Sequence, residues 1–500
     1  MFMLDILPEP HEVRRLPGPS YQLGPGFSVT SSDPLLVDAA TALLVETFGN
    51  PGQDGGVVLR LDSSVDNAEK PGAYVLQVVE RGVEIIAAAR EGIFHGLATL
   101  VQFGESYREI PAVRVADFAT YPWRGMHLDC ARHFLPVDDL RRFIDYLWRY
   151  KFNRLHWHLT DDQGWRAEIK AFPRLTAIGG WRKRTIKGHA KHEPWPFEYD
   201  EVPHGGFYTQ QEMSEIVHYA DARGIEIIPE IEMPGHATAA IAAYPELGCP
   251  GYSVEVAQEW GIYRHLFNVG SDRTMEMLRT VLDEVIEIFP SKWIHLGGDE
   301  CPTTFWERDP QCMRRMQVEG FKNHSQLHGW FMSRMGDHVV ARGRTPMAWD
   351  DVLDSGIDLS PFVITAWRGE SHLRKALQLG HQVVNCDMTH VYFDHYQVVD
   401  TTREPLMFGG FTDLERVLSF DPAPSALSRG QGGDVIGAQG HLWREYLPTN
   451  ERIEYNAFPR AIALAEVLWR GGPRPKMMME KIRRESAFLI RRGVNCCLLE

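Results

Sequence analysis

The sequence predicts an α/β protein, a (β/α)8 TIM barrel preceded by a small α+β domain. The 500 residues exceed what one ordinary single-core domain holds. Before about residue 118, short β-branched runs are separated by Gly, Pro, Asn and Asp. From Arg124 onward, eight strand-like runs alternate with helix-period segments, the pattern of repeated βα units. We therefore expect an α+β domain over 1–118, and a barrel domain with a closing C-terminal helix over 119–500.

The N-terminal domain is expected to contain strands and one helix. Residues 57–61 and 73–79 are β-branched runs bounded by turn residues. Residues 91–103 have the apolar spacing of a helix. This mixture is typical of a small α+β domain.

The barrel elements follow in order. Thr209 and Glu212 form a capping box that opens a helix ending near Gly224. One helical face that ends at Pro290 collects five apolar residues: Leu278, Val281, Leu282, Val285 and Phe289. The last thirty residues, around the run 477–479, predict a closing amphipathic helix. The eight expected strands are 124–131, 154–160, 225–233, 293–300, 345–351, 362–368, 382–388 and 434–443.

Composition and charge narrow the class of protein. Hydrophobic residues make up 44% and charged residues 24%, as in a soluble globular protein. The net charge of -15 opposes binding to nucleic acid or to an anionic membrane, so we expect neither partner. No apolar run reaches the roughly 18 residues of a membrane span. The N-terminus lacks the basic and apolar regions of a secretory signal, so we expect a cytoplasmic location.

The seven cysteines are scattered along the chain: Cys130, Cys249, Cys301, Cys312, Cys386, Cys496 and Cys497. Their odd number and the lack of a C-x-x-C spacing indicate neither a disulfide framework nor a zinc site. We expect buried or incidental free thiols.

Reactive side chains cluster where the expected strands end. These ends of a barrel face one shared cavity, so residues there meet in space. Carboxylates predominate, together with Arg, His and aromatic residues: Asp129 and Arg132, Asp161 and Asp162, Glu230, Glu232 and His236, Asp299 and Glu300, Trp349 and Asp350, Trp367, Tyr392 and Asp394, and Trp443 and Glu445. We expect the functional cavity at this end of the barrel.

The residue types at these positions indicate a sugar site. Pyranose rings have apolar faces that stack on indole, and hydroxyls that bind carboxylates and Arg. The chain has no phosphate-cradling Gly loop and no Ser-His-Asp or Cys-His arrangement. Two alternatives stay open: the Arg and its carboxylates could form a structural ion-pair network, and His156 and His158 could bind a metal, although a hydrogen-bonded structural role is favoured for them.

The strongest single motif is His-Leu-Gly-Gly-Asp-Glu at 295–300. Two glycines let the backbone pass close to a ligand. Adjacent carboxylates that face a cavity repel each other, which favours retention of a proton on one of them, as a general acid requires. Neighbouring side chains in a regular strand point to opposite faces. We therefore expect Asp299 and Glu300 to be a poor fit to an acid-nucleophile pair, and the nucleophile to lie elsewhere.

Four long segments carry a family resemblance: RGMHLDCARHF at 124–134, LHWHLTDDQGWR at 155–166, PEIEMPGH at 229–236 and GGDE at 297–300. Together they closely resemble the β-N-acetylhexosaminidases of glycoside hydrolase family 20. The resemblance continues in order through Trp349-Asp350, Trp367, Tyr392-Phe393-Asp394, Leu442-Trp443-Arg444-Glu445 and Phe458-Pro459-Arg460. Residues 92–97 resemble part of the α+β domain that precedes the barrel in this family. The resemblance implies a retaining exo-enzyme that removes terminal GlcNAc, or GalNAc, without a metal or a cofactor.

The resemblance also implies residue roles. Glu300 is the implied general acid/base. Asp299 is implied to orient the substrate's 2-acetamido group and to stabilise the oxazolinium ion that forms when its carbonyl oxygen attacks C1. Tyr392 is implied to hydrogen-bond that oxygen. Six residues are implied to bind the sugar: Arg132 at the 3- and 4-hydroxyls, Trp349, Trp367 and Trp443 around the acetamido methyl, and Asp394 and Glu445 at the 4- and 6-hydroxyls. Three are implied to position the catalytic carboxylates: Asp161, Glu232 and His236.

The chain departs from the family pattern in a few places. Glu232 stands where Asp is usual, so its expected contact with His236 has to accommodate one more methylene. Cys130 and Cys301 stand beside functional positions where other small residues are expected. Two further functions remain open, a non-catalytic amino-sugar-binding protein on the same fold and a relative that releases a disaccharide. The expected partner is a small glycan with a terminal N-acetylhexosamine, such as a chitooligosaccharide or a glycoconjugate.

Overall fold

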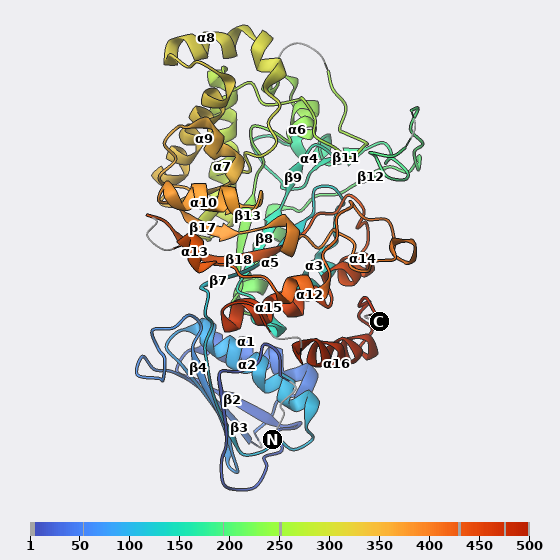
Figure 1. The fold of residues 1–500 in the computed structure, drawn as a ribbon. Coiled ribbons are helices and arrows are strands. Elements are labelled where there is room, and N and C mark those ends of the chain that lie inside the picture. Colours follow the sequence, from blue (N-terminus) through green and yellow to red (C-terminus); the bar gives the residue numbers. More distant parts are fainter. Residues whose placement is uncertain are drawn as a thin grey trace.

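The computed structural model describes residues 6–53, 55–193, 195–249, 253–428, 432–474 and 477–498. Figure 1 shows a layer of strands and helices at the N-terminal end and a larger barrel above it. The eight barrel strands close into one sheet, which confirms the predicted TIM barrel with a preceding α+β domain.

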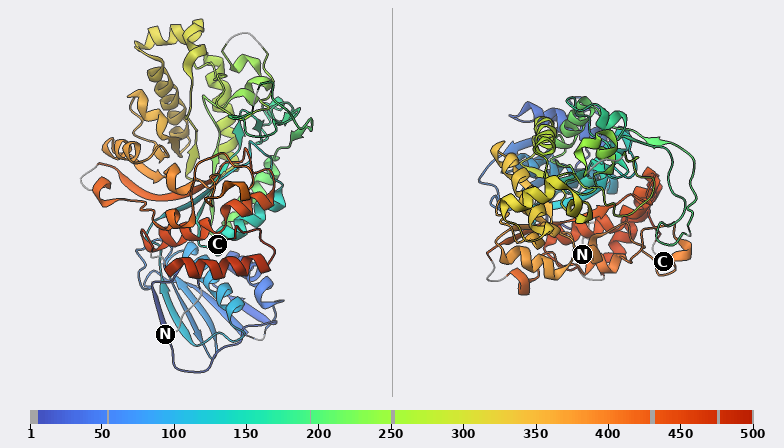
Figure 2. Two further views of the ribbon diagram at one scale, coloured as in Figure 1. Left: turned by 45° about the vertical axis from the view of Figure 1, so that its right-hand side comes forward. Right: turned by 90° about the horizontal axis from the view of Figure 1, so that it is seen from above.

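The N-terminal domain is a six-stranded sheet in the order β1-β6-β4-β5-β3-β2. Its elements are β1 (Glu12–Arg15), β2 (Phe27–Thr30), α1 (Pro34–Phe48), β3 (Gly55–Leu61), β4 (Tyr74–Val79), β5 (Gly82–Ala87), α2 (Arg90–Ser106) and β6 (Val113–Asp117). The strands expected at 57–61 and 73–79 are β3 and β4, and the helix expected at 91–103 is α2. Helix α2 and the C-terminal helix α16 (Met477–Arg491) lie between this sheet and the barrel (Figure 2).

All eight expected barrel strands are present, paired in parallel in the order β13-β14-β15-β16-β17-β18-β7-β8. They are β7 (Trp123–Asp129), β8 (Arg154–His158), β13 (Glu226–Glu230), β14 (Trp293–His295), β15 (Thr345–Trp349), β16 (Val363–Ala366), β17 (Gln382–Asn385) and β18 (Asp434–Leu442). Each ends earlier than expected, and the difference is largest for β14, which stops at His295 rather than Glu300. The chemistry-bearing residues therefore lie mostly in the loops that follow the strands.

Helices surround the barrel. The longer ones are α3 (Val137–Arg149), α5 (Gln210–Asp221), α7 (Asp272–Ile288), α8 (Pro310–Glu319), α9 (His324–Ala341), α10 (Glu370–Gln378), α14 (Asn450–Ala457) and α15 (Arg460–Arg470). Helix α5 begins with the predicted capping box at Thr209. Helix α7 buries the predicted apolar face, of which Leu278 and Leu282 are fully inside. The crossover from β15 to β16 contains only the 3-10 helix η3 (Asp350–Ser355).

Shorter elements occupy the loops. They are β9 (Thr160–Asp161), β10 (Gly164–Trp165), α4 (Arg174–Ala177), β11 (Trp181–Arg182), β12 (His204–Gly205), α6 (Thr238–Ala243), η1 (Pro245–Leu247), η2 (Thr303–Arg308), α11 (Met388–Val391), η4 (Thr401–Arg403), α12 (Leu414–Leu418) and α13 (Ser425–Ser428). Most lie in the long loops that follow β8, β13 and β17.

Buried polar contacts join the N-terminal domain to the barrel. Lys151 Nζ lies 3.0 Å from Asp117 Oδ2, and the Trp469 indole N–H donates to Asp117 Oδ1 over 2.9 Å. Arg124 Nη2 donates to Glu91 Oε1 over 2.8 Å. Lys151 and Arg124 lie just before β8 and at the start of β7, so this domain covers the amino ends of the barrel strands. The carboxyl ends remain free for the functional cavity.

Two further features concern the cysteines and the helices. All seven cysteines are free thiols, as expected. Among the helices of the described residues, none is long and apolar enough to cross a membrane.

Candidate active site

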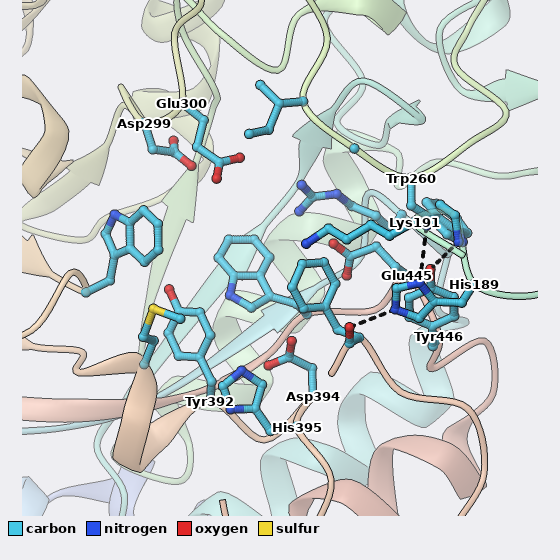
Figure 3. Close-up of a pocket in the computed structure, with 18 of the residues that line it drawn as sticks. His189, Lys191, Trp260, Asp299, Glu300, Tyr392, Asp394, His395, Glu445 and Tyr446 are labelled. Atoms are coloured by element: carbon cyan, nitrogen blue, oxygen red, sulfur yellow. Dashed lines mark hydrogen bonds between the residues drawn. The ribbon is translucent and has the colours of Figure 1, made fainter. Parts of the chain in front are cut away.

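A cavity of about 280 Å³ opens at the carboxyl ends of the barrel strands (Figure 3). The last residue of β15 and the segments that follow the other seven strands contribute to its wall. The nine residues expected to act on or bind the sugar line this one cavity: Arg132, Asp299, Glu300, Trp349, Trp367, Tyr392, Asp394, Trp443 and Glu445. Residues from 132 to 445 therefore meet only because the barrel closes.

Asp299 and Glu300 lie together in the loop after β14. The strand ends at His295, and Gly297 and Gly298 follow with φ angles of +65° and +95°. A Cβ on Gly297 would lie 1.7 Å from Glu232 Oε2, so both the space and the conformation require glycine. Our expectation that strand geometry turns the two carboxylates to opposite faces is wrong, because this segment is not a strand and both side chains line the cavity.

His236 contacts both cavity carboxylates. Its Nε2 lies 3.5 Å from Asp299 Oδ2 and 3.6 Å from Glu300 Oε2. Its Nδ1 lies 3.2 Å from Asp161 Oδ1 and 3.2 Å from Asp162 Oδ2. Burial opposes the charged form, but the carboxylates of Asp161 and Asp299 outweigh it and raise the pKa of His236 well above its ordinary value. A cationic imidazole therefore links the two cavity carboxylates to a buried aspartate pair.

The expected Glu232–His236 contact is not formed, and Asp161 and Asp162 take its place. Within the described part of the chain, neither carboxylate oxygen of buried Glu232 has a hydrogen-bond partner. Burial and the negative charges of Asp299 and Glu230 raise the pKa of Glu232 well above its ordinary value. The extra methylene places this carboxyl against the loop that precedes Asp299, where it would meet any Cβ at Gly297.

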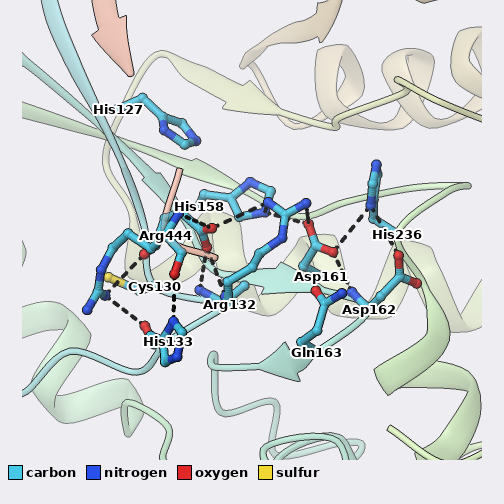
Figure 4. A network of polar contacts seen from close by, with 12 residues as sticks. His127, Cys130, Arg132, His133, His158, Asp161, Asp162, Gln163, His236 and Arg444 are labelled. Carbon is cyan, nitrogen blue, oxygen red and sulfur yellow. Dashed lines mark hydrogen bonds and ion pairs between the residues drawn. The ribbon is translucent and has the colours of Figure 1, made fainter. Parts of the chain in front are cut away.

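Arg132 is held by two aspartates, of which Figure 4 labels Asp161, and by an indole. Its Nη2 lies 2.8 Å from Asp161 Oδ2, and its Nη1 lies 3.4 Å from Asp129 Oδ2. The guanidinium carbon lies 5.0 Å from the centre of the Trp443 ring. The Arg132 Nε is buried and has no partner among the described residues. The ion-pair network that was left open as a structural alternative exists, and it places Arg132 in the cavity wall.

Aromatic side chains make up another part of the wall. The Trp349 indole N–H donates to Glu230 Oε1 over 2.8 Å, and the Trp367 indole N–H donates to Asp351 Oδ2 over 2.8 Å. Tyr392 lies nearly parallel to Trp367, with ring centres 6.4 Å apart. Burial and the charge of Asp299 raise the pKa of Asp351 to about 7. Hydrogen bonds thus fix the orientation of two indoles that line the cavity.

Three buried carboxylate oxygens in the cavity have no hydrogen-bond partner among the described residues: Asp299 Oδ1, Asp394 Oδ1 and Glu445 Oε2. Burial is the main cause that raises the pKa of Asp394 and of Glu445. Buried polar atoms in native proteins are nearly always hydrogen-bonded. These oxygens can accept hydrogen bonds from the hydroxyl and amide groups of a ligand. Asp394 and Glu445 lie at the end of the cavity away from Asp299 and Glu300 (Figure 3).

His158 and Glu230 also belong to this network, a role that was not predicted from the sequence. His158 Nδ1 makes a short contact with Glu230 Oε2, and its Nε2 lies 3.0 Å from Asp161 Oδ2. Burial would lower the pKa of His158, but Glu230 and Asp161 raise it to about 10. The Nδ1 of His156 is hydrogen-bonded to Gln439 Nε2, and its Nε2 lies 3.1 Å from Glu230 Oε2. Protein side chains therefore contact both His156 and His158, as in a structural role. No periodicity in the sequence distinguishes such a network from a row of core residues.

Loop residues complete the wall and were also missed. His189, Lys191, Trp260, Ile262, Phe408 and Tyr446 line the cavity. The His189 Nε2 bonds to the Phe408 carbonyl over 2.9 Å, which joins the loops after β8 and β17. The only available signal was the length of these loops, because their sequences carry no motif.

Comparisons with known proteins agree with this geometry. The model of the glycosyl hydrolase family 20 catalytic domain matches residues 121–472, and the model of domain 2 of the same family matches residues 3–118. The chain is 37% identical to a β-hexosaminidase of Porphyromonas gingivalis over 88% of this chain and 55% of that protein. It is 34% identical to a β-hexosaminidase of Akkermansia muciniphila over 84% of each.

A solved structure extends the comparison. The exo-β-N-acetylglucosaminidase of Vibrio harveyi in complex with N-acetylglucosamine superimposes with a TM-score of 0.83 and 29% identity, over 99% of this chain and 78% of that one. The present chain thus spans little more than half of the Porphyromonas protein but most of the other two. Its two domains, its cavity and these matches together show that the chain belongs to family 20 of the glycosyl hydrolases.

Proposed function

We propose that this protein is a retaining exo-β-N-acetylhexosaminidase that removes terminal non-reducing GlcNAc from small glycans, with GalNAc as the second glycone. The observation that carries the proposal is the set of buried, unpartnered carboxylate oxygens of Asp299, Asp394 and Glu445 in one small cavity. A terminal N-acetylhexosamine supplies an amide N–H at one end and hydroxyls at the other. The β-hexosaminidases among its relatives support the same activity.

The cavity supports exo action. Its volume of about 280 Å³ lies at the small end for ligand sites and suits one sugar ring. Asp394 and Glu445 close the end away from Glu300, where they meet hydroxyls of the terminal ring, and Arg132 lines the same cavity. A disaccharide-releasing enzyme needs a wider pocket.

In the proposed reaction the nucleophile belongs to the substrate. The acetamido oxygen attacks C1 while Glu300 donates a proton to the leaving oxygen, and an oxazolinium ion forms. Asp299 accepts the amide N–H through Oδ1 and stabilises the positive charge that develops on the acetamido group. Tyr392 donates a hydrogen bond from its hydroxyl to the attacking oxygen, and Trp349, Trp367 and Trp443 enclose the methyl group. Water then opens the ion with Glu300 as the base, so configuration at C1 is retained.

Cationic His236 supports these steps. It contacts both carboxylates at about 3.5 Å and is itself held by Asp161 and Asp162. This contact holds the Asp299 carboxyl group in the cavity wall, beside the position proposed for the acetamido group. Attack within the bound sugar replaces a bimolecular step, so fixing the acetamido group in an attack-ready pose lowers the barrier.

A panel of nitrophenyl glycosides tests the activity. We expect rapid hydrolysis of the GlcNAc substrate, and near inertness of the glucoside, because its plain 2-hydroxyl lacks the attacking oxygen. Binding of GlcNAc without turnover would establish the sugar-binding alternative instead. Faster release of lacto-N-biose than of GlcNAc would favour the disaccharide-releasing alternative.

Substituted acetamido groups test the mechanism. Trifluoroacetamido substrates should react much more slowly, because fluorine withdraws electrons from the attacking oxygen. Asp299→Asn should lose most activity, while no protein carboxylate should be labelled by a 2-fluoro glycoside. A covalent glycosyl ester on any Asp or Glu, or equal rates for the two acetamido groups, would refute the substrate-assisted reaction.

A further inference from the structure

Four side chains able to bind a metal meet outside the catalytic cavity. Cys249 Sγ lies 3.9 Å from Cys312 Sγ, and Cys312 Sγ lies 3.3 Å from Asn268 Oδ1. Asn268 Nδ2 lies 3.3 Å from Asp309 Oδ2. Cys312, Asn268 and Asp309 are buried and Cys249 is half-buried. No zinc site was expected, because the cysteines are odd in number, scattered and without a C-x-x-C spacing, and these two are 63 residues apart.

The separation of the two sulfurs matches joint ligation of one ion. Two thiolates bound to zinc at about 2.3 Å with a tetrahedral angle between them lie about 3.8 Å apart. The sulfurs of a disulfide lie about 2.05 Å apart. One ligand atom from each of Cys249, Asp309 and Cys312 lies within 4.8 Å of the other two. The donors thus already surround a point that a single ion can occupy.

The carboxylate of Asp309 is held in a fixed position in which it can bind an ion. Its Oδ1 accepts the backbone N–H groups of Gln311 and Cys312 over 2.9 Å each, as the N-cap of α8. These bonds fix the carboxylate. Its Oδ2 accepts a hydrogen bond from Asn268 Nδ2 over 3.3 Å and, like any carboxylate oxygen, keeps a further lone pair that can bind an ion. The Asn268 carboxamide oxygen, which lies beside Cys312, supplies a fourth donor.

The donor chemistry selects the metal. Two soft thiolates disfavour Mg²⁺ and Ca²⁺, which prefer all-oxygen sites. Zinc accepts mixed sulfur and carboxylate ligands in a tetrahedral arrangement, and four protein ligands make a closed structural site. Each thiol releases its proton to solvent when it binds the ion.

We propose that Cys249, Asn268, Asp309 and Cys312 bind a structural Zn²⁺. Cys249 and Asn268 lie at the two ends of the loop after β13, where Gly248 pairs with Phe267. This loop carries Trp260 and Ile262 to the cavity wall.

Asp309 and Cys312 belong to the segment that follows Glu300 and begins α8, at the barrel end remote from the N-terminal domain (Figure 1). The ion therefore ties one wall of the cavity to the loop that bears the catalytic carboxylates.

Elemental analysis of the full chain, purified under reducing conditions, tests the proposal. We expect about one zinc ion per chain, retained through gel filtration, and its loss in Cys249→Ser and Cys312→Ser. Cys496→Ser, which changes a buried thiol elsewhere, should retain the ion. Asp309→Asn preserves the helix cap, since Asn caps as well as Asp, but removes the anionic ligand and should weaken retention.

Two further measurements do not depend on whether the serine variants fold. Cobalt added to the chelator-treated wild type should give the sulfur-to-metal charge-transfer band of a tetrahedral thiolate site. Zinc should protect Cys249 and Cys312 from alkylation, and a chelator should reverse that protection. Three results would each overturn the proposal. The first is an unchanged zinc content in both serine variants. The second is a wild type that contains no zinc and takes up no cobalt, and the third is a disulfide between Cys249 and Cys312.

Discussion

His158 is the buried centre of the network beneath the cavity, and replacing it by Gln tests the network directly. In the wild type, the charged imidazole lies between Glu230 and Asp161 and contacts both. Glu230 accepts the hydrogen bond of the Trp349 indole. Asp161 contacts both Arg132 and His236. Gln keeps a hydrogen-bond donor but carries no charge. We therefore expect His158→Gln to destabilise the barrel and to loosen Arg132 and His236 together.

The pKa of His158 gives the size and the pH dependence of this effect. An unfolded His titrates near 6.5, whereas His158 in the folded protein titrates at about 10. Because the folded pKa is the higher one, the stabilisation is full below about pH 6.5 and is lost as pH rises towards 10. Each pH unit between these values removes about 1.4 kcal/mol, which makes about 2.7 kcal/mol between pH 7 and pH 9 and about 5 kcal/mol in all.

Urea unfolding of wild type and variant at pH 7 and pH 9 measures the difference. The free energy of unfolding lost on His158→Gln should be larger at pH 7 than at pH 9. An exposed histidine replaced in the same way, His218→Gln, should show little change at either pH. A destabilisation by His158→Gln that is equal at both values would refute the buried imidazolium. The variant's kcat/KM for a GlcNAc substrate should also fall about 10- to 150-fold, the value of one or two charge-assisted hydrogen bonds.

Three further substitutions probe the cavity. Glu300→Gln should lower kcat by about 10²- to 10⁴-fold, with a smaller deficit for very acidic leaving groups, and equal deficits across aryl leaving groups would contradict its role as the acid. Arg132→Ala should lower kcat/KM by about 10- to 150-fold with an unchanged circular dichroism spectrum, and an unaltered kcat/KM would exclude a sugar clamp. Trp349→Phe removes the indole N–H bond to buried Glu230 Oε1 and leaves His295 Nδ1, at 2.9 Å, beside that oxygen. The free energy of unfolding in urea should therefore fall by about 1–3 kcal/mol, and no change would show that the indole bond is dispensable.

Local sequence patterns predicted the elements well. The capping box at Thr209 and the buried face of α7 depend on residues three or four apart, so they can be read without tertiary information. The predicted positions of the strand ends were less accurate than the predicted elements themselves. The apolar pattern continues to Leu296, but Gly297 and Gly298 take positive φ angles that end the pairing of β14. This error made the Asp299–Glu300 pair look divergent when both side chains line one cavity.

The substitution at Glu232 shows the limit of reasoning from a motif. The motif predicted a contact between Glu232 and His236, but the His236 ring contacts Asp161 and Asp162 instead. Which carboxylate an imidazole contacts depends on angles and distances of a few tenths of an ångström between separate loops. No pattern along the chain reports such distances.

The sequence by itself determined that eight βα units close a barrel, and it located the carboxylates and aromatic residues at the ends of their strands. Hydrophobic periodicity and turn residues act over a few positions, and the closed barrel then brings every strand end to one place. Only the tertiary structure decided which charges are paired, as with His158 between Glu230 and Asp161, and which distant thiols meet, as with Cys249 and Cys312. Burial and electrostatic coupling act through space, so they depend on the packed arrangement of loops and not on their order in the chain.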